Sequence, residues 1–261
     1  MQPSDTPNSA ELLTVIVPCL NEEDSIVSTT EEIYAELERI KPVELRVILC
    51  DDGSTDRTGE LIEGLCERFP NCRMLQNPKN MGLGMTVKRA YDLVEPNSWV
   101  TVLPGDGEIV FASIHEFLKH RDEADLILGY LRNPVIRTFK RRLASSAYNG
   151  LANWLYGFDF RYFNGFKMYR LEVFKGIDIV ASGHATTVEL IAKAVLRQPS
   201  LRIMEVPFVW RARHARDSHA FKPSSIVHAV LETQRAYQSV SEFRQRQYVD
   251  ALEATPDGGD S

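Results

Sequence analysis

Short apolar runs alternate with amphipathic stretches through the first half of the chain. The apolar runs are rich in β-branched and aliphatic side chains and predict strands over residues 12–17, 45–50, 73–76, 99–103 and 125–129. The stretches between them predict helices over residues 22–40, 58–68 and 85–94. Strands that alternate with helices form a mainly parallel sheet with right-handed crossovers. We therefore predict an α/β fold in a single domain, with a Rossmann-like, mainly parallel sheet flanked by helices.

The pattern is less regular after residue 129. Residues 139–158 and 183–196 have helical periodicity, residues 203–208 predict a strand, and residues 224–253 predict a long C-terminal helix. The sequence has no internal repeat and no second domain boundary. We expect a flexible N-terminus over residues 1–11, the α/β domain over 12–223, the C-terminal helix over 224–253 and a disordered tail over 254–261.

Composition narrows the functional classes. The chain has 261 residues, is 44% hydrophobic and carries a formal net charge of −6, so it can bury a sizeable core and is no general nucleic-acid binder. Its cysteines form no C-x-x-C pair, and Cys19 and Cys50 lie in apolar runs, where we expect reduced core thiols. The first residues lack a signal-peptide pattern, and no apolar run approaches the ~18 residues of a spanning helix. We therefore expect a cytoplasmic protein.

Two carboxylates end the second predicted strand. Asp51 and Asp52 follow its apolar run and precede Gly-Ser-Thr-Asp, which predicts a turn and then a helix start. In open α/β sheets, ligands bind in the crevice outside the carboxyl ends of the strands. Two adjacent acids cannot cradle phosphate by themselves, but they suit ribose hydroxyls, base N–H groups or a metal ion. This strand end therefore predicts a nucleotide-like ligand.

Basic residues gather between residues 132 and 170, where Asp159 is the single acid. Within this segment, apolar residues recur at three- and four-residue steps over residues 139–158 and form one face of a helix, beside Lys140, Arg141 and Arg142. Two interpretations stay open. The helix can pack on the core with a solvated basic face, or it can lie at a membrane surface and also meet an anionic acceptor. Each basic residue near an anionic leaflet contributes about 1 kcal/mol, so such attachment would be reversible and sensitive to salt.

Five motifs and one longer segment resemble a single enzyme family in order and spacing. They are TVIVPCLNEE, VILCDDGSTDRT, NPKNMGLGMTVKRAYD, VTVLPGDGE, YFNGFKMYR and residues 189–222. Over residues 13–222 the chain thereby resembles family 2 glycosyltransferases, and most of all the polyprenyl-phosphate sugar synthases such as dolichol-phosphate mannosyltransferase. The resemblance implies the GT-A fold, a GDP- or UDP-linked sugar donor, a polyprenyl-phosphate acceptor, a divalent cation and inversion at the anomeric carbon.

The resemblance also implies which residues bind the donor. These positions are Pro18, Asn21, Glu22, Asp51, Asp52, Ser54, Asn80, Gly82 and Lys88. Structural alternatives stay open at several of them. The first three can form a strand-end turn before an acidic helix start, and Ser54 can be a turn or cap residue. The N-x-G-x-G segment over residues 80–84, called the glycine loop below, can be an ordinary turn, and Lys88 can be solvated.

The implied metal position departs from the family's usual pattern. Where the family has Asp-x-Asp, this chain has Pro104 in the first place, Asp106 in the second and Glu108 two residues later. A proline side chain cannot bind a metal, but two carboxylates two residues apart can converge on one hard cation. The resemblance therefore implies Mg²⁺ or Mn²⁺ at Asp106 and Glu108, with Asp106 as a catalytic residue. The alternative is an Asp-Gly turn without metal.

A phosphate acceptor is already anionic, so it needs cationic positioning and no general base. The positions predicted to bind it are Arg142, Asn149, Arg213, Ser218, His219 and Lys222, with His219 in place of the family's lysine. The alternative for residues 211–222 is a solvated basic loop. Glu189, on the helix predicted over residues 183–196, is either solvated or in the acceptor cleft, and it is the catalytic-base candidate for a hydroxyl acceptor. Three functions stay open: transfer to polyprenyl phosphate by a peripheral enzyme at the cytoplasmic membrane face, transfer to a soluble hydroxyl, and nucleotide-sugar binding without activity.

Overall fold

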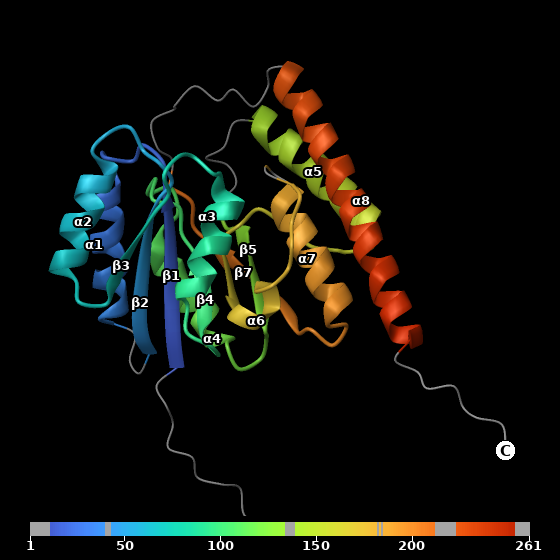
Figure 1. Cartoon of the computed structure of the whole chain (residues 1–261), viewed down its shortest axis with the longest axis horizontal. Coiled ribbons are helices and arrows are strands. Elements are labelled where there is room, and N and C mark those ends of the chain that lie inside the picture. Colours follow the sequence, from blue (N-terminus) through green and yellow to red (C-terminus); the bar gives the residue numbers. More distant parts are fainter. Residues whose placement is uncertain are drawn as a thin grey trace, which may run out of the picture.

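The computed structural model of the chain describes residues 11–39, 43–133, 139–181, 183, 185–211 and 223–253. Its centre is a seven-stranded sheet in the order β3-β2-β1-β4-β6-β5-β7. The strands are β1 Glu11–Cys19, β2 Val43–Asp51, β3 Cys72–Gln76, β4 Trp99–Val102, β5 Leu126–Leu131, β6 Lys167–Arg170 and β7 Ile203–Phe208. All run parallel except β6, which is antiparallel to both of its neighbours. The predicted α/β class with a mainly parallel sheet is confirmed (Figure 1).

Helices cover both faces of the sheet (Figure 1). They are α1 Ile26–Leu37, α2 Thr58–Arg68, α3 Leu83–Ala90, α4 Ile114–Lys119, α5 Phe139–Tyr156, α6 Leu171–Phe174, α7 Ala185–Arg197 and α8 Pro223–Glu253, with 3₁₀ turns η1 Tyr91–Leu93 and η2 Phe111–Ser113. Apolar side chains of α1, α2, η2 and α4 pack on one face of the sheet. Those of α3, α5, α6 and α7 pack on the other. None of the helices in the described ranges combines the length and apolar character needed to cross a bilayer.

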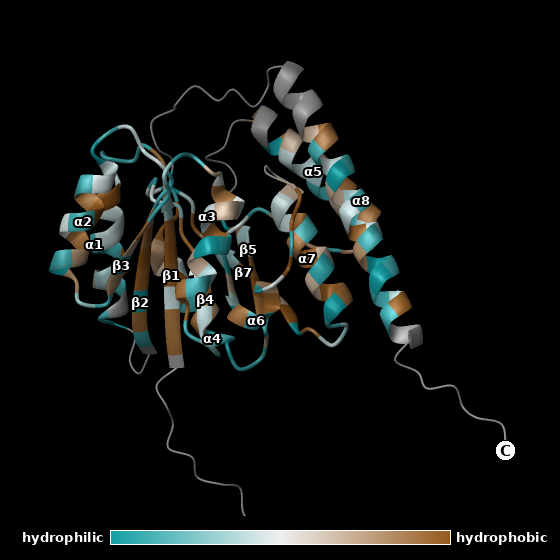
Figure 2. Ribbon diagram, viewed as in Figure 1, coloured by the Kyte–Doolittle hydropathy of each residue, from teal (hydrophilic) through white to brown (hydrophobic). Residues whose placement is uncertain are grey.

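The central strands are apolar on both faces because each face is covered by helices. In β1, Leu13, Val15 and Val17 join the cluster under α1 and α2, whereas Ile16 joins the cluster under α3 and α7. These four side chains are fully buried. β1 and β2 accordingly are coloured as mostly hydrophobic in Figure 2. The strands form a rigid frame whose ends carry the loops.

Several element boundaries differ from the prediction for local reasons. α1 begins at Ile26 instead of residue 22, because the Glu22 carbonyl accepts the Ser25 and Ile26 N–H groups and closes a turn first. α5 ends at Tyr156, just before Gly157 at φ +71°, a usual helix-ending conformation. β6 was not predicted as a strand. It is four residues long and carries lysine and arginine at its two ends, so its period-two pattern is weak.

Candidate functional site

The parallel strands bring three loops to one edge of the sheet. Cys19, at the end of β1, pairs with Asp51, at the end of β2, and Asp51 pairs in turn with Gln76, at the end of β3. The end of β4 lies on the other side of β1. The loops that follow these strands hold most of the predicted donor residues, so the structure brings those residues together.

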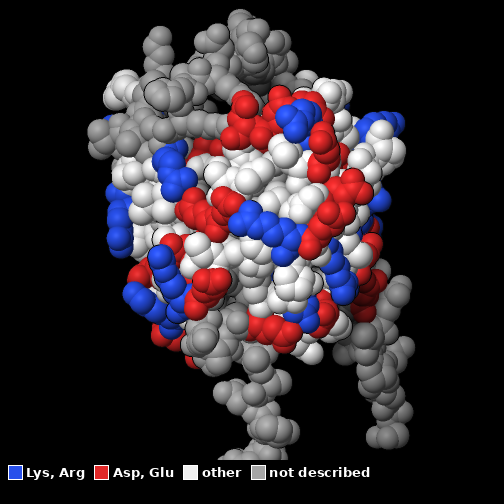
Figure 3. Space-filling view, turned by 90° about the vertical axis from the view of Figure 1, so that its left-hand side faces the viewer, with Lys and Arg blue, Asp and Glu red and all other residues white. Residues whose placement is uncertain are grey.

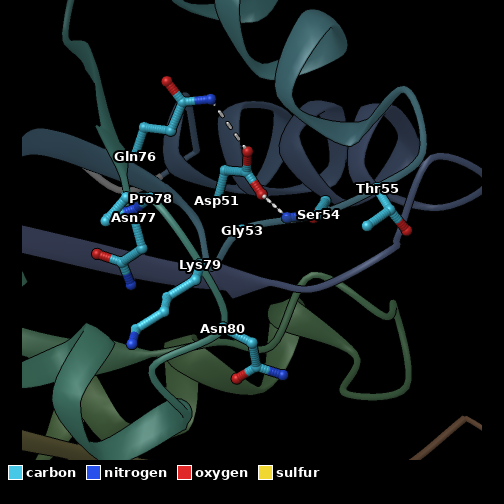
Figure 4. A pocket seen from close by; sticks show the side chains of 9 residues that line it. All are labelled: Asp51, Gly53, Ser54, Thr55, Gln76, Asn77, Pro78, Lys79 and Asn80. Carbon is cyan, nitrogen blue, oxygen red and sulfur yellow. Dashed lines mark hydrogen bonds between the residues drawn. The ribbon is translucent and has the colours of Figure 1, made fainter.

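A cavity of about 700 Å³ opens at this edge. It is lined by Asp51, Gly53, Ser54, Thr55, Gln76, Asn77, Pro78, Lys79 and Asn80 (Figure 4). Asp51 is 3% exposed. Its carboxylate accepts the Ser54 N–H at 2.9 Å and lies 3.4 Å from the amide nitrogen of Gln76 (Figure 4). The volume falls within the range of small-molecule sites, and a fixed carboxylate with neighbouring amides can recognise a polar ring edge or a hydroxyl.

An adjoining cavity of about 370 Å³ extends the site along α2. It shares Asp51, Ser54 and Gln76 with the first and adds Asp56, Glu60 and Glu63. The Asp56 carboxylate is itself engaged, because it accepts the Thr58 hydroxyl at 2.6 Å and the Thr58 N–H at 3.0 Å. These hydrogen bonds lower the pKa of Asp56, against the effect of partial burial. The two cavities together form a polar groove with Asp51 at its centre.

Asp52 has a different role from Asp51, although the two are adjacent. Asp52 is 5% exposed, and its carboxylate accepts the Met81 and Gly82 N–H groups at 2.9 Å each. It also accepts the Asn77 side-chain amide at 2.7 Å. With three donors, Asp52 fixes the loop between β3 and α3. Successive residues at a strand end point to opposite sides, which explains why one acid faces the cavity and its neighbour supports the loop.

The loops after β1 and β2 hydrogen-bond to each other reciprocally. Asn21, at φ +55°, donates its N–H to the Ser54 hydroxyl at 3.0 Å, while its side-chain oxygen accepts the Thr55 N–H at 2.8 Å. The Glu22 N–H donates to the Thr58 hydroxyl at 2.8 Å. The Pro18 carbonyl accepts the Gly105 N–H at 3.0 Å and so ties β1 to the loop after β4. These predicted donor residues therefore lie in one connected backbone framework.

Glycine is required where the second and third loops meet. Gly53 has φ +75°, and a Cβ at this position would lie 2.4 Å from the carbonyl carbon of Lys79. Gly82, at φ +82°, is the residue before α3 and donates to Asp52 and to the Asn80 side-chain oxygen. Only glycine adopts these conformations without strain. The glycine loop is therefore held in one conformation by its contacts with Gly53 and Asp52.

The cations after the glycine loop have protein partners. Lys88 Nζ lies 2.5 Å from the Asp178 carboxylate, in the loop between α6 and α7. Arg89 donates to the side-chain oxygen of Asn77, which in turn supports Asp52. The Lys88–Asp178 pair lowers the pKa of Asp178. Contact between Lys88 and a donor diphosphate stays a prediction, and the observed pairing ties α3 to the α6–α7 loop.

Asp106 and Glu108 lie half-buried after β4, in a tight turn. One Asp106 carboxylate oxygen accepts the Glu108 N–H at 3.0 Å, and Gly107 between them has φ +68°. The Glu108 carbonyl accepts the Arg211 N–H at 2.6 Å. In the described ranges, no group of three or more His, Cys, Asp and Glu side chains could hold a metal ion. Two carboxylates nevertheless fit a magnesium-type ion, which commonly takes one or two from the protein and the rest from phosphates and water.

Glu189 is neither solvated nor at an open surface. It is 0% exposed and accepts the Val180 N–H at 3.1 Å, the Ala181 N–H at 2.9 Å and the Lys193 ammonium at 2.7 Å. Lys193 also donates to the Asp178 carbonyl and the Ser239 hydroxyl of α8. The predicted solvated alternative is therefore wrong. A base role for Glu189 stays untested, but its contacts fix the α6–α7 loop and join α7 to α8.

The predicted acceptor residues divide into two groups. Arg142 is exposed on α5, whereas Asn149 is 8% exposed, donates to the Arg161 carbonyl and accepts the Phe163 N–H. Asn149 therefore fixes the loop before β6. Arg213, Ser218, His219 and Lys222 lie outside the described residues.

Much of the α5 apolar stripe faces solvent, so its core-packed interpretation is wrong for that part. The exposed fractions are 74% for Phe139, 61% for Leu143, 44% for Leu151 and 79% for Trp154. Residues spaced by three and four positions share one side of a helix, so these side chains form one row. The face over α1 and α2 is different: acidic and basic side chains are intermixed there (Figure 3), and Arg68 pairs with Glu31 at 2.6 Å.

Sequence reasoning missed several residues that shape the site. Gln76 and Asn77 follow β3, Thr55 and Thr58 connect the first two loops, and Gly53 lets the loops approach. The end of the third predicted strand was the available signal for Gln76 and Asn77, because it lies at the same sheet edge. The contacts of Thr55 and Thr58 join residues more than 30 positions apart and had no local signal.

Several known proteins resemble this chain in sequence. The family model described as Glycosyl transferase family 2 matches residues 14–178. The glycosyltransferase AglD of Haloferax volcanii is 27% identical over 212 residues, which are 77% of this chain but 33% of that protein, so the chain spans about a third of its length. The polyprenol monophosphomannose synthase of Mycolicibacterium smegmatis is 24% identical over 211 residues, covering 76% of this chain and 77% of that protein.

A solved structure of similar fold is glucosyl-3-phosphoglycerate synthase from Mycobacterium tuberculosis in complex with UDP. It superposes with a TM-score of 0.64 at 18% identity, over 90% of this chain and 86% of the other. The same synthase with Mn²⁺, UDP and glucosyl-3-phosphoglycerate has a TM-score of 0.61 at 15% identity, over 91% of this chain and 81% of the other. At these identities the likeness shows the fold.

Proposed function

We propose that this chain, which belongs to glycosyl transferase family 2, transfers a sugar from a nucleotide-sugar donor to a polyprenyl phosphate. The transfer inverts the configuration at the anomeric carbon. The observation that carries the proposal is the position of Asp51. Its buried carboxylate lies at the carboxyl edge of the sheet, in a polar cavity large enough for a nucleoside. A relative that the chain matches over three quarters of both lengths is named as a polyprenol monophosphomannose synthase.

Donor binding in this account depends on a prearranged framework. Asp51 accepts hydrogen bonds from the base or ribose, while Asp52 holds the glycine loop in place for the diphosphate. Asn21, Glu22 and Ser54 keep the first two loops at a fixed separation. Because these groups are already ordered, little side-chain entropy is lost when the nucleotide binds. The donor is GDP- or UDP-linked, and UDP is the nucleotide named in the solved structures of similar fold.

Asp106 and Glu108 would hold Mg²⁺ or Mn²⁺ against the donor diphosphate. The cation, when bound, neutralises the negative charge that develops on the departing nucleoside diphosphate. The chain's own contribution is to present two carboxylates at the end of β4, with Asp106 oriented by the Glu108 N–H. Mn²⁺ is named in one of the solved structures of similar fold.

A phosphate acceptor suits the chemistry of the residues predicted to bind the acceptor. A hydroxyl nucleophile would need a general base, and the candidate Glu189 is fully buried with an ammonium and two backbone N–H groups already bound to it. A phosphate monoester attacks as an anion and needs positive charge close to it. Arg142 on α5 and the predicted group of Arg213, Ser218, His219 and Lys222 would supply that positioning.

The exposed row on α5 supports the proposed peripheral position on a membrane. Phe139, Leu143, Leu151 and Trp154 present apolar surface on the helix that carries Arg142. Apolar side chains beside basic ones are the pattern of helices that lie in the interface of an anionic bilayer. In this arrangement the lipid tail of the acceptor stays in the bilayer while its phosphate reaches the strand ends.

A turnover assay tests the proposed reaction. The full chain is incubated with radiolabelled UDP- and GDP-sugars, Mn²⁺, and either a polyprenyl phosphate in vesicles or a soluble hydroxyl acceptor such as phosphoglycerate. The account predicts a labelled lipid that is stable to mild base and cleaved by mild acid, as expected for a sugar phosphodiester. Transfer to the soluble hydroxyl alone would contradict the lipid acceptor. Absence of transfer to both acceptors with every donor would contradict the proposed activity.

Vesicle sedimentation tests the membrane position. Trp154→Gln should weaken binding to anionic vesicles about tenfold or more, because an aromatic side chain no longer enters the interface. Arg142→Gln should weaken it about fivefold, from about 1 kcal/mol per basic residue, and added salt should reduce that difference. Tyr248→Gln is the matched control, an exposed aromatic near the end of α8. Equal sedimentation of all four proteins would remove α5 from a membrane contact.

A further inference from the structure

Two thiols lie against each other near the amino end of β3. The cavity lined by Asp51 and Gln76 lies at the opposite, carboxyl end of the strands. Cys66 belongs to α2 and Cys72 is the first residue of β3. Their sulfur atoms are 2.7 Å apart, whereas the bond in a disulfide is about 2.05 Å long. Both are free thiols in this structure. The side chains therefore already point at each other, and a bond between them requires only a small approach.

The surroundings of the pair give its two members different reactivity. Cys66 is half-buried and is therefore more accessible than Cys72, which is 9% exposed. The hydrogen bond between the thiols lowers the pKa of Cys66 and raises that of Cys72. The thiolate is the attacking form of cysteine. Cys66 is therefore the member suited to react first, with Cys72 placed to resolve the product.

An aromatic pair lies near the thiols. Tyr34 of α1 stacks on Phe69 with ring centroids 3.9 Å apart, and Phe69 lies in the short connection between the two cysteines. The Tyr34 hydroxyl is buried and has no hydrogen-bond partner among the described residues. Burial raises the pKa of Tyr34, and the neighbouring Cys72 and Cys66 raise it further. A neutral hydroxyl beside these sulfurs is a donor that a Cys66 thiolate can accept from.

The other two cysteines provide an internal contrast. Cys19 is 2% exposed and Cys50 is 0% exposed, and both lie within the apolar layers of the sheet. Burial raises the pKa of Cys50 to about 12 and that of Cys19 as well. Neither forms a sulfur–sulfur contact among the described residues. They are structural thiols of low reactivity.

We propose that Cys66 and Cys72 are a reversible disulfide site, oxidised by exchange with a small-molecule disulfide such as oxidised glutathione. The Cys66 thiolate attacks one sulfur of the reagent, the S–S bond of the reagent breaks, and one glutathione thiol leaves with a proton. Cys72, after loss of its proton, attacks the Cys66 sulfur and releases the second glutathione thiol. Two cysteine thiols are thereby oxidised by two electrons, and one reagent disulfide is reduced to two thiols.

The new bond would join α2 to β3 at the amino end of that strand. Cys72 pairs with Val47, whereas the cavity residue Gln76 pairs with Asp51 at the opposite end. The proposal therefore does not depend on the nature of the ligand or on the proposed transfer reaction. A bond that closes a short loop restricts the unfolded chain, so the oxidised protein should have a higher Tm than the reduced protein.

Differential alkylation of the full chain tests the proposal. The folded protein is exposed to oxidised glutathione and quenched with acid. Its free thiols are blocked in denaturant with N-ethylmaleimide, and thiols released by reduction are then labelled with iodoacetamide. We expect the iodoacetamide label on Cys66 and Cys72 together, N-ethylmaleimide on Cys19 and Cys50, and an intact mass without a glutathione adduct. Dithiothreitol before the quench should restore all four thiols.

Variants identify the order of the two steps. Cys72→Ser removes the resolving thiol, so this variant should retain one glutathione on Cys66. Cys19→Ser is the matched control and should oxidise like the unchanged chain. The wild-type measurement itself needs no variant to fold. The proposal would be overturned if all four wild-type thiols remained blocked by N-ethylmaleimide, if wild-type Cys66 accumulated glutathione, or if the disulfide linked two chains.

Discussion

Two parts of the structure are held together by different means. The loops after β1, β2 and β3 form the donor side of the proposed site, and α5, α7, α8 and the α6–α7 loop form the far side. On the donor side, three loops bind each other through short reciprocal hydrogen bonds, such as those between Asn21 and the Ser54–Thr55 pair and those from the β3–α3 loop to Asp52. On the far side, one buried ion pair, Glu189 with Lys193, links α7, α8 and the α6–α7 loop. There α5 exposes a row of large apolar side chains.

The difference indicates what each side is adapted to meet. Loops fixed before a ligand arrives suit a small polar molecule, because preorganisation reduces the entropy lost on binding. An exposed apolar helix suits an extended apolar surface, because its burial requires no fixed geometry. The two sides also touch: Lys88 of α3 pairs with Asp178, in the loop that Lys193 supports. Substitutions can therefore test whether the sides fail separately or together.

The largest expected effect comes from the buried ion pair. Lys193→Met should lower the free energy of unfolding by about 3–5 kcal/mol, because it leaves the Glu189 carboxylate buried without its cation. Lys119→Met is the matched control. Its pair with Glu116 is solvent-exposed and should contribute at most about 1 kcal/mol. Urea denaturation measures both. A similar small loss in the two variants would show that the far side does not depend on this pair.

A somewhat smaller effect, on catalysis alone, is expected at Asp106. Asp106→Asn keeps an oxygen that can accept the Glu108 N–H, so the turn is retained while the negative charge is lost. We expect sugar transfer to fall by a factor on the order of 100 to 1,000, the usual cost of losing one transition-state electrostatic contact. Glu108→Gln should fall less. The Tm of both variants should match that of the parent. Undiminished turnover of Asp106→Asn would separate this carboxylate from the reaction.

The next largest effect is expected at the contact between the loop after β2 and the loop after β3. Gly53→Ala introduces a side chain at φ +75° and 2.4 Å from a backbone carbon of Lys79. We expect a loss of about 1–3 kcal/mol in stability, together with weaker nucleotide binding, because the loops must separate. Gly64→Ala, in the exposed interior of α2, should instead stabilise the protein by about 0.5–1 kcal/mol. If both changes stabilised the chain, the close approach of the loops would not hold in solution.

The sequence predicts the fold well where its signals are local. The strand over 203–208 and the helix over 58–68 match β7 and α2 residue for residue, because apolar periodicity and polar flanks coincide there. β6 was not predicted as a strand because its pairing depends on β4 and β5, which lie far away in the chain. The apolar face of α5 was also visible in the sequence. Whether it packs or stays exposed depends on which elements cover it.

For individual site residues too, the sequence predicts local position but not contacts with distant parts of the chain. The position of Asp51 and Asp52 at a strand end was predicted, but their separate roles follow from the direction in which each side chain points. The helix position of Glu189 was also predicted. Its burial and its contact with Lys193 depend on the α6–α7 loop and on α8. Such contacts join distant parts of the chain, and no pattern in a short window records them.

The central claim is that Asp51 recognises a nucleoside in the cavity after β2, and calorimetric titration tests it most directly. UDP and GDP, each with Mn²⁺, are titrated into the parent chain, Asp51→Asn and the exposed-acid control Asp122→Asn. The account predicts that at least one nucleotide binds the parent and Asp122→Asn equally. Asp51→Asn should bind it about tenfold to over a hundredfold more weakly, for a charge-assisted hydrogen bond worth about 1.5–3 kcal/mol. Equal affinity in all three proteins, or no binding of either nucleotide to the parent, would contradict it.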